Sequence, residues 1–123
     1  MEKHILLIDD DIDEPEIFIH ALKEAKLLFS CTWANGADDG FEILKKLKTD
    51  YIVLDYNMPK INGLEMLEKL KTDKNLKEIP VIMYSATMDN TLIAKAIQLG
   101  ATGCIRKPYN INELPGLLRP FFS

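Results

Sequence analysis

The chain has few of the residues that build small disulfide-bonded or metal-stabilised scaffolds. Its 123 residues include two cysteines, Cys31 and Cys104, and two histidines. Two cysteines are too few for a disulfide framework, and this set lacks the spacing of a structural zinc site. A chain of this length buries enough surface to fold without either. We therefore expect one ordinary globular domain over residues 1–123.

Long apolar runs and an excess of positive charge are also missing. No apolar run approaches the ~18 residues of a membrane-spanning helix, and the apolar run after the first residues is too short for a signal peptide. Nineteen acidic and fifteen basic side chains give a net charge of −4, whereas nucleic-acid-binding proteins usually present a basic face. We expect a cytoplasmic protein that binds neither nucleic acid nor membrane.

Five short apolar runs recur along the chain at roughly even spacing. They cover residues 5–8, 31–34, 51–54, 81–84 and 103–105. The first, third and fourth runs are continuous and largely aliphatic, which is typical of strands that a parallel sheet buries on both faces. The second run is more mixed in composition, which favours a position at the edge of the sheet.

Helix-length segments with apolar residues at helical spacing separate these runs. The predicted apolar faces are Phe18, Ala21, Leu22 and Ala25; Ala37, Phe41, Leu44 and Leu47; Leu64, Leu67 and Leu70; and Leu92, Ile93, Ala96 and Ile97. Residues 112–121 contain two prolines and a glycine. We therefore expect the last helix to be short or irregular.

Polar residues mark where these helices begin and end. Asp13 and Asp89 are candidate N-caps of the first and fourth helices. Asn35 or Asp38 opens the second helix, and Gly100 ends the fourth. Alternating strands and helices indicate βαβ units with right-handed crossovers. The predicted fold is an α/β, flavodoxin-like (βα)5 doubly wound parallel sheet with strand order 2-1-3-4-5.

Polar residues follow four of the five predicted strands at the point where each strand ends. They are Asp9, Asp10 and Asp11 after the first, Asp55 after the third, Ser85 after the fourth and Lys107 after the fifth. Ligands of open parallel sheets bind outside the carboxyl ends of the strands. Neighbouring carboxylates repel each other unless a cation joins them, and Mg²⁺ prefers carboxylate, water and phosphate oxygens. The pattern predicts a phosphoryl site in which Asp55 is a candidate nucleophile and Lys107 and Ser85 donate hydrogen bonds.

These motifs, in their order and spacing, resemble the receiver domain of two-component response regulators over essentially the whole chain. The matching segments are Ile8-Asp9-Asp10; Leu54-Asp55-Tyr56-Asn57-Met58-Pro59 with Asn62-Gly63; Ser85-Ala86; and Gly100-Ala101-Thr102-Gly103 through Lys107-Pro108. The resemblance implies that Asp55 accepts a phosphoryl group from a histidine kinase or a histidine phosphotransfer protein.

The resemblance also implies roles for the other site residues. Mg²⁺, or Mn²⁺, is held by Asp10, Asp55 and the backbone carbonyl of Asn57, with Asp9 acting nearby or through water. Ser85 and Lys107 contact the phosphoryl oxygens.

Further residues are implied to shape the backbone and to tune the reaction. The peptide bond between Lys107 and Pro108 is cis in such domains. Asn57 and Thr87 match the positions that tune dephosphorylation by admitting or blocking water.

The chain departs from the family pattern at Cys104. Receivers usually have tyrosine or phenylalanine there, and its inward turn accompanies switching. A cysteine has no ring to bury, so Tyr84 or Tyr109 takes part of this readout in our hypothesis. The face of the fourth helix, fifth strand and fifth helix is the expected partner surface, and we expect a monomer or a weak dimer through it.

The expected function is that of a complete, single-domain response regulator that signals through protein contacts. It catalyses only its own phosphorylation and dephosphorylation and is not a metabolic enzyme. One alternative is a receiver-fold docking module that acts without phosphorylation. A second is a small phosphatase or flavin-binding protein. Aspartate-nucleophile phosphatases commonly need a second aspartate where this chain has Asn57, and three aspartates after the first strand would repel a flavin phosphate.

Overall fold

The computed structural model describes residues 2–122 of the chain, which form a five-stranded parallel sheet between two layers of helices. The strands are β1 (Lys3–Ile8), β2 (Phe29–Ala34), β3 (Tyr51–Leu54), β4 (Val81–Ser85) and β5 (Gly103–Arg106). The helices are α1 (Glu14–Glu24), α2 (Ala37–Lys46), α3 (Gly63–Thr72), α4 (Asn90–Gln98) and α5 (Leu114–Leu118), with a short 3-10 helix, η1 (Ile111–Glu113), before α5. All strand pairs are parallel and the order is β2-β1-β3-β4-β5. The predicted flavodoxin-like order and the edge position of β2 are confirmed.

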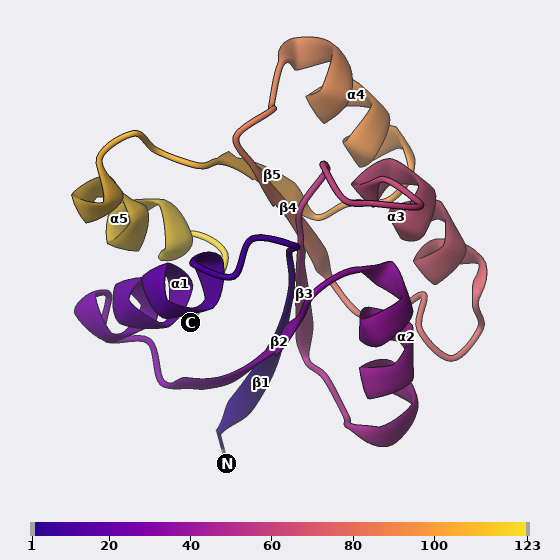
Figure 1. The fold of residues 1–123 in the computed structure, drawn as a ribbon, viewed down its shortest axis with the longest axis horizontal. Helices are drawn as coiled ribbons and strands as arrows, with labels where there is room; N and C mark the ends of the chain where they lie inside the picture. Colours follow the sequence, from indigo (N-terminus) through magenta and orange to yellow (C-terminus); the bar gives the residue numbers. More distant parts are fainter. Residues whose placement is uncertain (1, 123) are drawn as a thin grey trace.

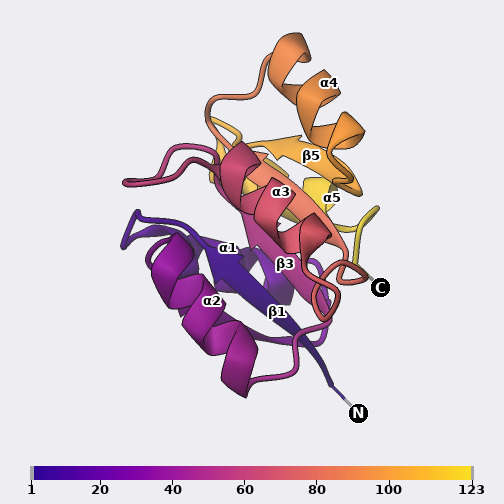
Figure 2. The same cartoon turned by 90° about the vertical axis from the view of Figure 1, so that its right-hand side faces the viewer.

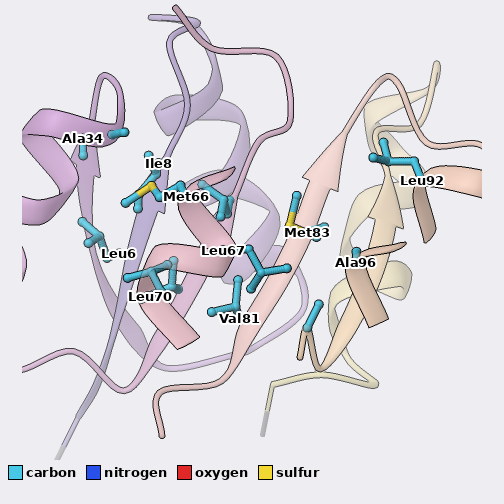
Figure 3. Packing of buried hydrophobic residues seen from close by; sticks show 14 of the residues in the cluster. Leu6, Ile8, Ala34, Met66, Leu67, Leu70, Val81, Met83, Leu92 and Ala96 are labelled. Carbon is cyan, nitrogen blue, oxygen red and sulfur yellow. The ribbon is translucent and has the colours of Figure 1, made fainter. Parts of the chain in front are cut away.

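Helices α1 and α5 cover one face of the sheet, and α2, α3 and α4 cover the other (Figure 1; Figure 2). Successive side chains of a strand point to opposite faces, so β1 contributes to both apolar cores. Leu6 and Ile8 pack in the core beneath α2, α3 and α4, whereas Ile5 and Leu7 pack beneath α1 and α5. Figure 3 shows the first of these cores, where Met66 of α3 lies beside Ile8 of β1 and Leu67 lies beside Val81 of β4.

Three of the helix ends are fixed by side chains or by backbone geometry. The Asp89 carboxylate accepts a hydrogen bond from the backbone N–H of Leu92 at 2.8 Å, so the predicted cap of α4 is confirmed. Gly100 follows the end of α4 with φ +106°, a left-handed conformation that glycine adopts at little cost. A capping box of Asn62 and Glu65 opens α3 directly after the acceptor segment.

Two predicted caps are wrong in detail. Asp13 stands at the N-cap of α1, but its backbone is helical and its side chain makes no capping hydrogen bond. Gly36, rather than Asn35 or Asp38, is the N-cap of α2. The backbone N–H of Asn35 is instead held by the Asp39 carboxylate at 3.2 Å, which leaves Asn35 outside the helix.

Two predicted core positions face solvent. Helix α2 ends at Lys46, and the following Leu47 is extended and 41% exposed. Ile97, in the last turn of α4, is 49% exposed. Leu47 follows the last residue of α2. Ile97 lies on the side of α4 that faces away from the core, since its neighbours Ala96 and Leu99 pack against that core.

The last helix is short, as its prolines and glycine predict. The chain after it returns to the core, where Phe122 is 1% exposed and its ring lies edge-on to those of Phe18, Phe29 and Tyr51. Phe122 therefore completes the core beneath α1 and α5. Within residues 2–122, every helix is too short or too polar to cross a bilayer.

Candidate functional site

The carboxyl ends of β1, β3, β4 and β5 bring together the polar residues singled out in the sequence. Carboxylate oxygens of Asp9, Asp10 and Asp55 lie within 4.8 Å of one another. The Lys107 ammonium is 4.0 Å from Asp55 Oδ1. Asp9, Asp55 and Ser85 are buried, whereas Asp10 is exposed. The residues at the strand ends thus form one cluster, which is exposed to solvent at Asp10.

The backbone hydrogen bonds of the sheet continue past the strand ends to Asp55 and Lys107. The Asp55 N–H donates to the carbonyl of Ile8 at 2.9 Å, and the Lys107 N–H donates to that of Ser85 at 3.0 Å. Neighbouring strands therefore fix the backbone of Asp55 and Lys107.

Gly63, the first residue of α3, lies against the backbone of the acceptor segment. Its N–H donates to the Tyr56 carbonyl at 2.8 Å. A Cβ atom at this position would lie 2.3 Å from the carbonyl oxygen of Asp55. The close approach explains why glycine follows Asn62 here.

Lys107 is the positive centre of the cluster. Its Nζ donates to Asp9 Oδ2 at 2.7 Å, lies 3.3 Å from Glu14 Oε2, and sits 5.2 Å from the centre of the Tyr84 ring. Burial lowers the pKa of Lys107, but the hydrogen bond to Asp9 and the charges of Asp55, Asp9 and Glu14 outweigh it and raise the pKa above its ordinary value. The ammonium therefore stays charged at neutral pH.

Asp55 has the opposite balance of burial and charge. Burial and the neighbouring charge of Asp9 raise the pKa of Asp55 to about 6, although Lys107, the Ser85 hydroxyl and the Tyr56 N–H favour the ionised form. The carboxylate is thus an ionised but poorly stabilised anion at neutral pH, and a further cation would relieve it.

The chemistry of the three carboxylates fits a hard divalent cation. Their ligand atoms are all oxygens, and Asp10 is on the solvent side where a metal could keep water ligands. Asp9 already uses both oxygens in the protein, since Oδ1 accepts the N–H of Asp11 at 3.0 Å and Oδ2 binds Lys107. Asp10 and Asp55 therefore have the greater freedom to bind a cation.

The structure brings the predicted tuning residues together. The Asn57 side-chain amide donates to the Thr87 hydroxyl at 2.9 Å, joining the segments that follow β3 and β4. Thr87 N–H in turn donates to the Ser85 hydroxyl at 3.3 Å. These contacts link Asn57, Thr87 and Ser85 in one chain of hydrogen bonds above β4.

The residues of the switch hypothesis lie apart from one another. Tyr84 is 1% exposed beneath α1, whereas Tyr109 is fully exposed. Cys104 is partly buried on β5 and lines a surface hollow together with Tyr109. Tyr84 and Tyr109 therefore occupy different environments, and of the two only Tyr109 lines the hollow that contains Cys104.

The expected cis peptide before Pro108 is wrong, because residues 2–122 contain only trans peptide bonds. The trans form is favoured by ~0.5–1 kcal/mol even before proline. Lys107 keeps its backbone bond to Ser85 and its contact with Asp9 in this arrangement, so the local contacts do not demand the cis form.

Glu14 is a site residue that the sequence reasoning missed. It is 5% exposed, accepts a hydrogen bond from the Tyr84 hydroxyl at 3.1 Å through Oε1, and faces Lys107 through Oε2. The available signal was its spacing: Glu14 stands four residues before Phe18 and seven before Ala21, in line with the apolar face of α1. A charged residue within a buried stripe requires a partner.

The single tryptophan is placed to report on cation binding. The indole N–H of Trp33 donates to the backbone carbonyl of Asp9 at 2.7 Å. We expect Mg²⁺ to change the Trp33 fluorescence with one-site saturation, because the cation shifts the charge next to this hydrogen bond. Asp10→Asn should abolish the saturable change, and the exposed Asp38→Asn should retain it. The same saturable change in Asp10→Asn would contradict this placement of the cation.

Comparison with known proteins agrees with the fold. A family model described as "Response regulator receiver domain" matches residues 5–119. The chain is 35% identical to chemotaxis protein CheY-3 of Vibrio cholerae over 97% of this chain and 91% of the relative. Phosphorylated cyanobacterial phytochrome response regulator RcpA has the same fold, with a TM-score of 0.87, 24% identity and coverage of 98% and 91%. The Mn²⁺-bound form of response regulator Rcp1 also has this fold, with a TM-score of 0.84 and 22% identity over 96% of this chain and 90% of that chain. With the family model matching nearly the whole chain, this protein belongs to the response regulator receiver domain family.

Proposed function

We propose that this receiver accepts a phosphoryl group on Asp55 in a divalent-cation-dependent reaction and signals through protein contacts. The observation that carries the proposal is the position of Asp55. Its carboxylate lies at the end of a buried strand, 4.0 Å from an ammonium and within 4.8 Å of two further carboxylates. The candidate nucleophile, a hydrogen-bond donor for the phosphoryl oxygens and the candidate cation ligands thus lie next to one another.

The transfer follows from the roles of these residues. A carboxylate oxygen of Asp55 attacks the phosphorus of a phosphohistidine, a P–O bond forms, and the P–N bond breaks with its electron pair remaining on the imidazole of the donor. Lys107 and Ser85 donate hydrogen bonds to the phosphoryl oxygens. At neutral pH Asp55 is mostly ionised, because its pKa of about 6 lies below neutrality. The nucleophile therefore needs no separate base.

Mg²⁺ or Mn²⁺ fits the same site. Asp10 and Asp55, with Asp9 nearby, would hold it, and the carbonyl of Asn57 is the fourth proposed contributor. The bound cation would neutralise negative charge on the carboxylates and on the phosphoryl oxygens. The Mn²⁺-bound state of the similar Rcp1 supports this assignment.

The proposed donor is a histidine kinase or a histidine phosphotransfer protein, and the proposed output is a protein that reads the face of α4, β5 and α5. The resemblance to a chemotaxis receiver along nearly its full length supports an output of this type. The fully exposed Tyr109 and the hollow lined by Cys104 lie on that face. We propose a monomer or a weak dimer through it.

The test is incubation with a small acyl phosphate and Mg²⁺, followed by intact-mass measurement. We expect one added phosphoryl group, lost on chelation of the metal and lost in Asp55→Asn. Asp38→Asn, an exposed change of the same kind, should accept the group like the wild type. A protein that gains no mass and also fails to bind beryllofluoride would contradict phosphorylation and favour the docking module.

A further inference from the structure

A third buried carboxylate, that of Glu14, contacts Lys107 of the acceptor site. Its two oxygens have different partners: Oε1 accepts the Tyr84 hydroxyl at 3.1 Å, and Oε2 lies 3.3 Å from Lys107 Nζ. The side chain of Glu14 is 7% exposed, and that of Lys107 is 17% exposed. This is a desolvated ion pair rather than a surface contact.

Lys107 is consequently shared among three carboxylates. Its Nζ is 2.7 Å from Asp9 and 3.3 Å from Glu14, but 4.0 Å from Asp55. An ammonium has three donors, and the two shorter contacts, to Asp9 and Glu14, occupy two of them. A phosphoryl group on Asp55 would have to compete with Glu14 for the same ammonium.

We propose that Glu14 is a positioning residue of the acceptor site, which holds the Lys107 ammonium back from Asp55 and thereby weakens the site's affinity for anionic phosphodonors. Tyr84 keeps Glu14 in this position through its hydroxyl. The inference rests on the proposed function, since it concerns the same phosphoryl group. It assigns to Tyr84 the task of orienting Glu14.

The charge of Glu14 acts in the same direction as its contact. Glu14, Asp9 and Asp55 place three negative charges around Lys107, and an incoming phosphodonor adds more. Like charges brought together in a partly desolvated site oppose binding. Replacing Glu14 by glutamine removes the charge but keeps an oxygen that can accept from Tyr84. Lys107 then remains bound to Asp9 and is freer to reach the phosphoryl oxygens.

The kinetic test compares Glu14→Gln with the wild type at increasing acyl phosphate concentration. We expect the half-saturating concentration to fall about three- to tenfold, while the maximal rate stays within about twofold. Glu16→Gln, an exposed change of the same charge on the same helix, should match the wild type. Tyr84→Phe should lower the half-saturating concentration in the same direction, and it keeps the test available if Glu14→Gln fails to fold.

A second readout needs no phosphodonor. The NMR signal of the Lys107 ammonium reports its contacts directly, and we expect it to shift in Glu14→Gln and in Tyr84→Phe but not in Glu16→Gln. A purely structural role of Glu14 would leave the half-saturating concentration unchanged even where the loss of its contact shifts this signal.

The outcomes separate the two proposals. A wild type that takes up phosphate, with an unchanged or raised half-saturating concentration in Glu14→Gln, overturns the role of Glu14 and leaves the proposed function intact. An unshifted ammonium signal in that variant also overturns it. A wild type that accepts no phosphoryl group overturns the proposed function, and the inference falls with it even where the ammonium signal shifts.

Discussion

The Asp55→Asn variant is expected to be more stable than the wild type by about 2–3 kcal/mol near pH 8 without divalent cations. Burial and the charge of Asp9 raise the pKa of Asp55 from 3.8 to about 6. The folded protein therefore binds a proton in a range where the unfolded chain has already released it. Wild-type stability should fall as the pH rises from about 4 to about 6 and stay low above that range.

Urea denaturation at several pH values, followed by circular dichroism, measures this effect. Asparagine resembles the protonated carboxyl group, so the variant should lose this part of the pH dependence. The advantage of the variant should shrink when Mg²⁺ is added, because a cation bound to the wild type relieves the same repulsion. Asp38→Asn, at a carboxylate that is 78% exposed, should stay within about 0.5 kcal/mol of the wild type. A less stable Asp55→Asn variant would contradict the charge balance of the site.

The Lys107→Met variant is expected to be less stable than the wild type by about 3 kcal/mol near pH 8 without divalent cations. Lys107 is the partner of the buried carboxylates of Asp9 and Glu14, at 2.7 and 3.3 Å. Removing the ammonium leaves these charges without their partner inside the protein. The folded-state pKa of Lys107 is raised, so its stabilising charge is fully present below its ordinary pKa, at neutral pH.

Lys60→Met is the matched control, because Lys60 forms an ion pair of 2.9 Å with Asp38 in which both side chains are 78% exposed. An exposed pair contributes little, so this variant should lose less than about 1 kcal/mol. The loss in Lys107→Met should become smaller as the pH falls from about 8 toward about 6, because Asp55 takes up a proton and one negative charge of the cluster is removed. This protonation begins at a higher pH in the variant, since the charge of Lys107 lowers the pKa of Asp55 in the wild type. Equal losses in the two lysine variants would show that the buried cluster does not depend on Lys107.

The part of the site that lies on the sheet could be predicted from the sequence. Asp55, Ser85 and Lys107 each follow an apolar run, and a parallel sheet brings the ends of such runs to one edge. The strand order followed from the five alternating strand and helix patterns, and the mixed composition of residues 31–34 indicated that this run lies at the edge. Backbone pairing makes both inferences robust to the details of side-chain packing.

The parts that depend on packing between layers could not be predicted. Glu14 is buried only because α1 lies against β4, where Tyr84 points toward the helix. Its partner Lys107 is far away in the sequence. Leu47 and Ile97 fit a helical pattern but are exposed, and periodicity alone does not show where α2 ends or which side of α4 faces the sheet. The peptide bond before Pro108 is trans. The sequence motif does not determine this, because the small energy difference between the two forms depends on local contacts.

The most direct test of the account is to locate the phosphoryl group in the chain. Treating the phosphorylated protein with borohydride reduces an aspartyl phosphate to homoserine, which peptide mass spectrometry then assigns to one position. We expect homoserine at Asp55 alone, and only in protein that was phosphorylated in the presence of Mg²⁺. Homoserine at Asp9, Asp10 or Asp11 instead, or unmodified Asp55 in protein that has gained phosphate, would contradict the assignment of Asp55 as the acceptor.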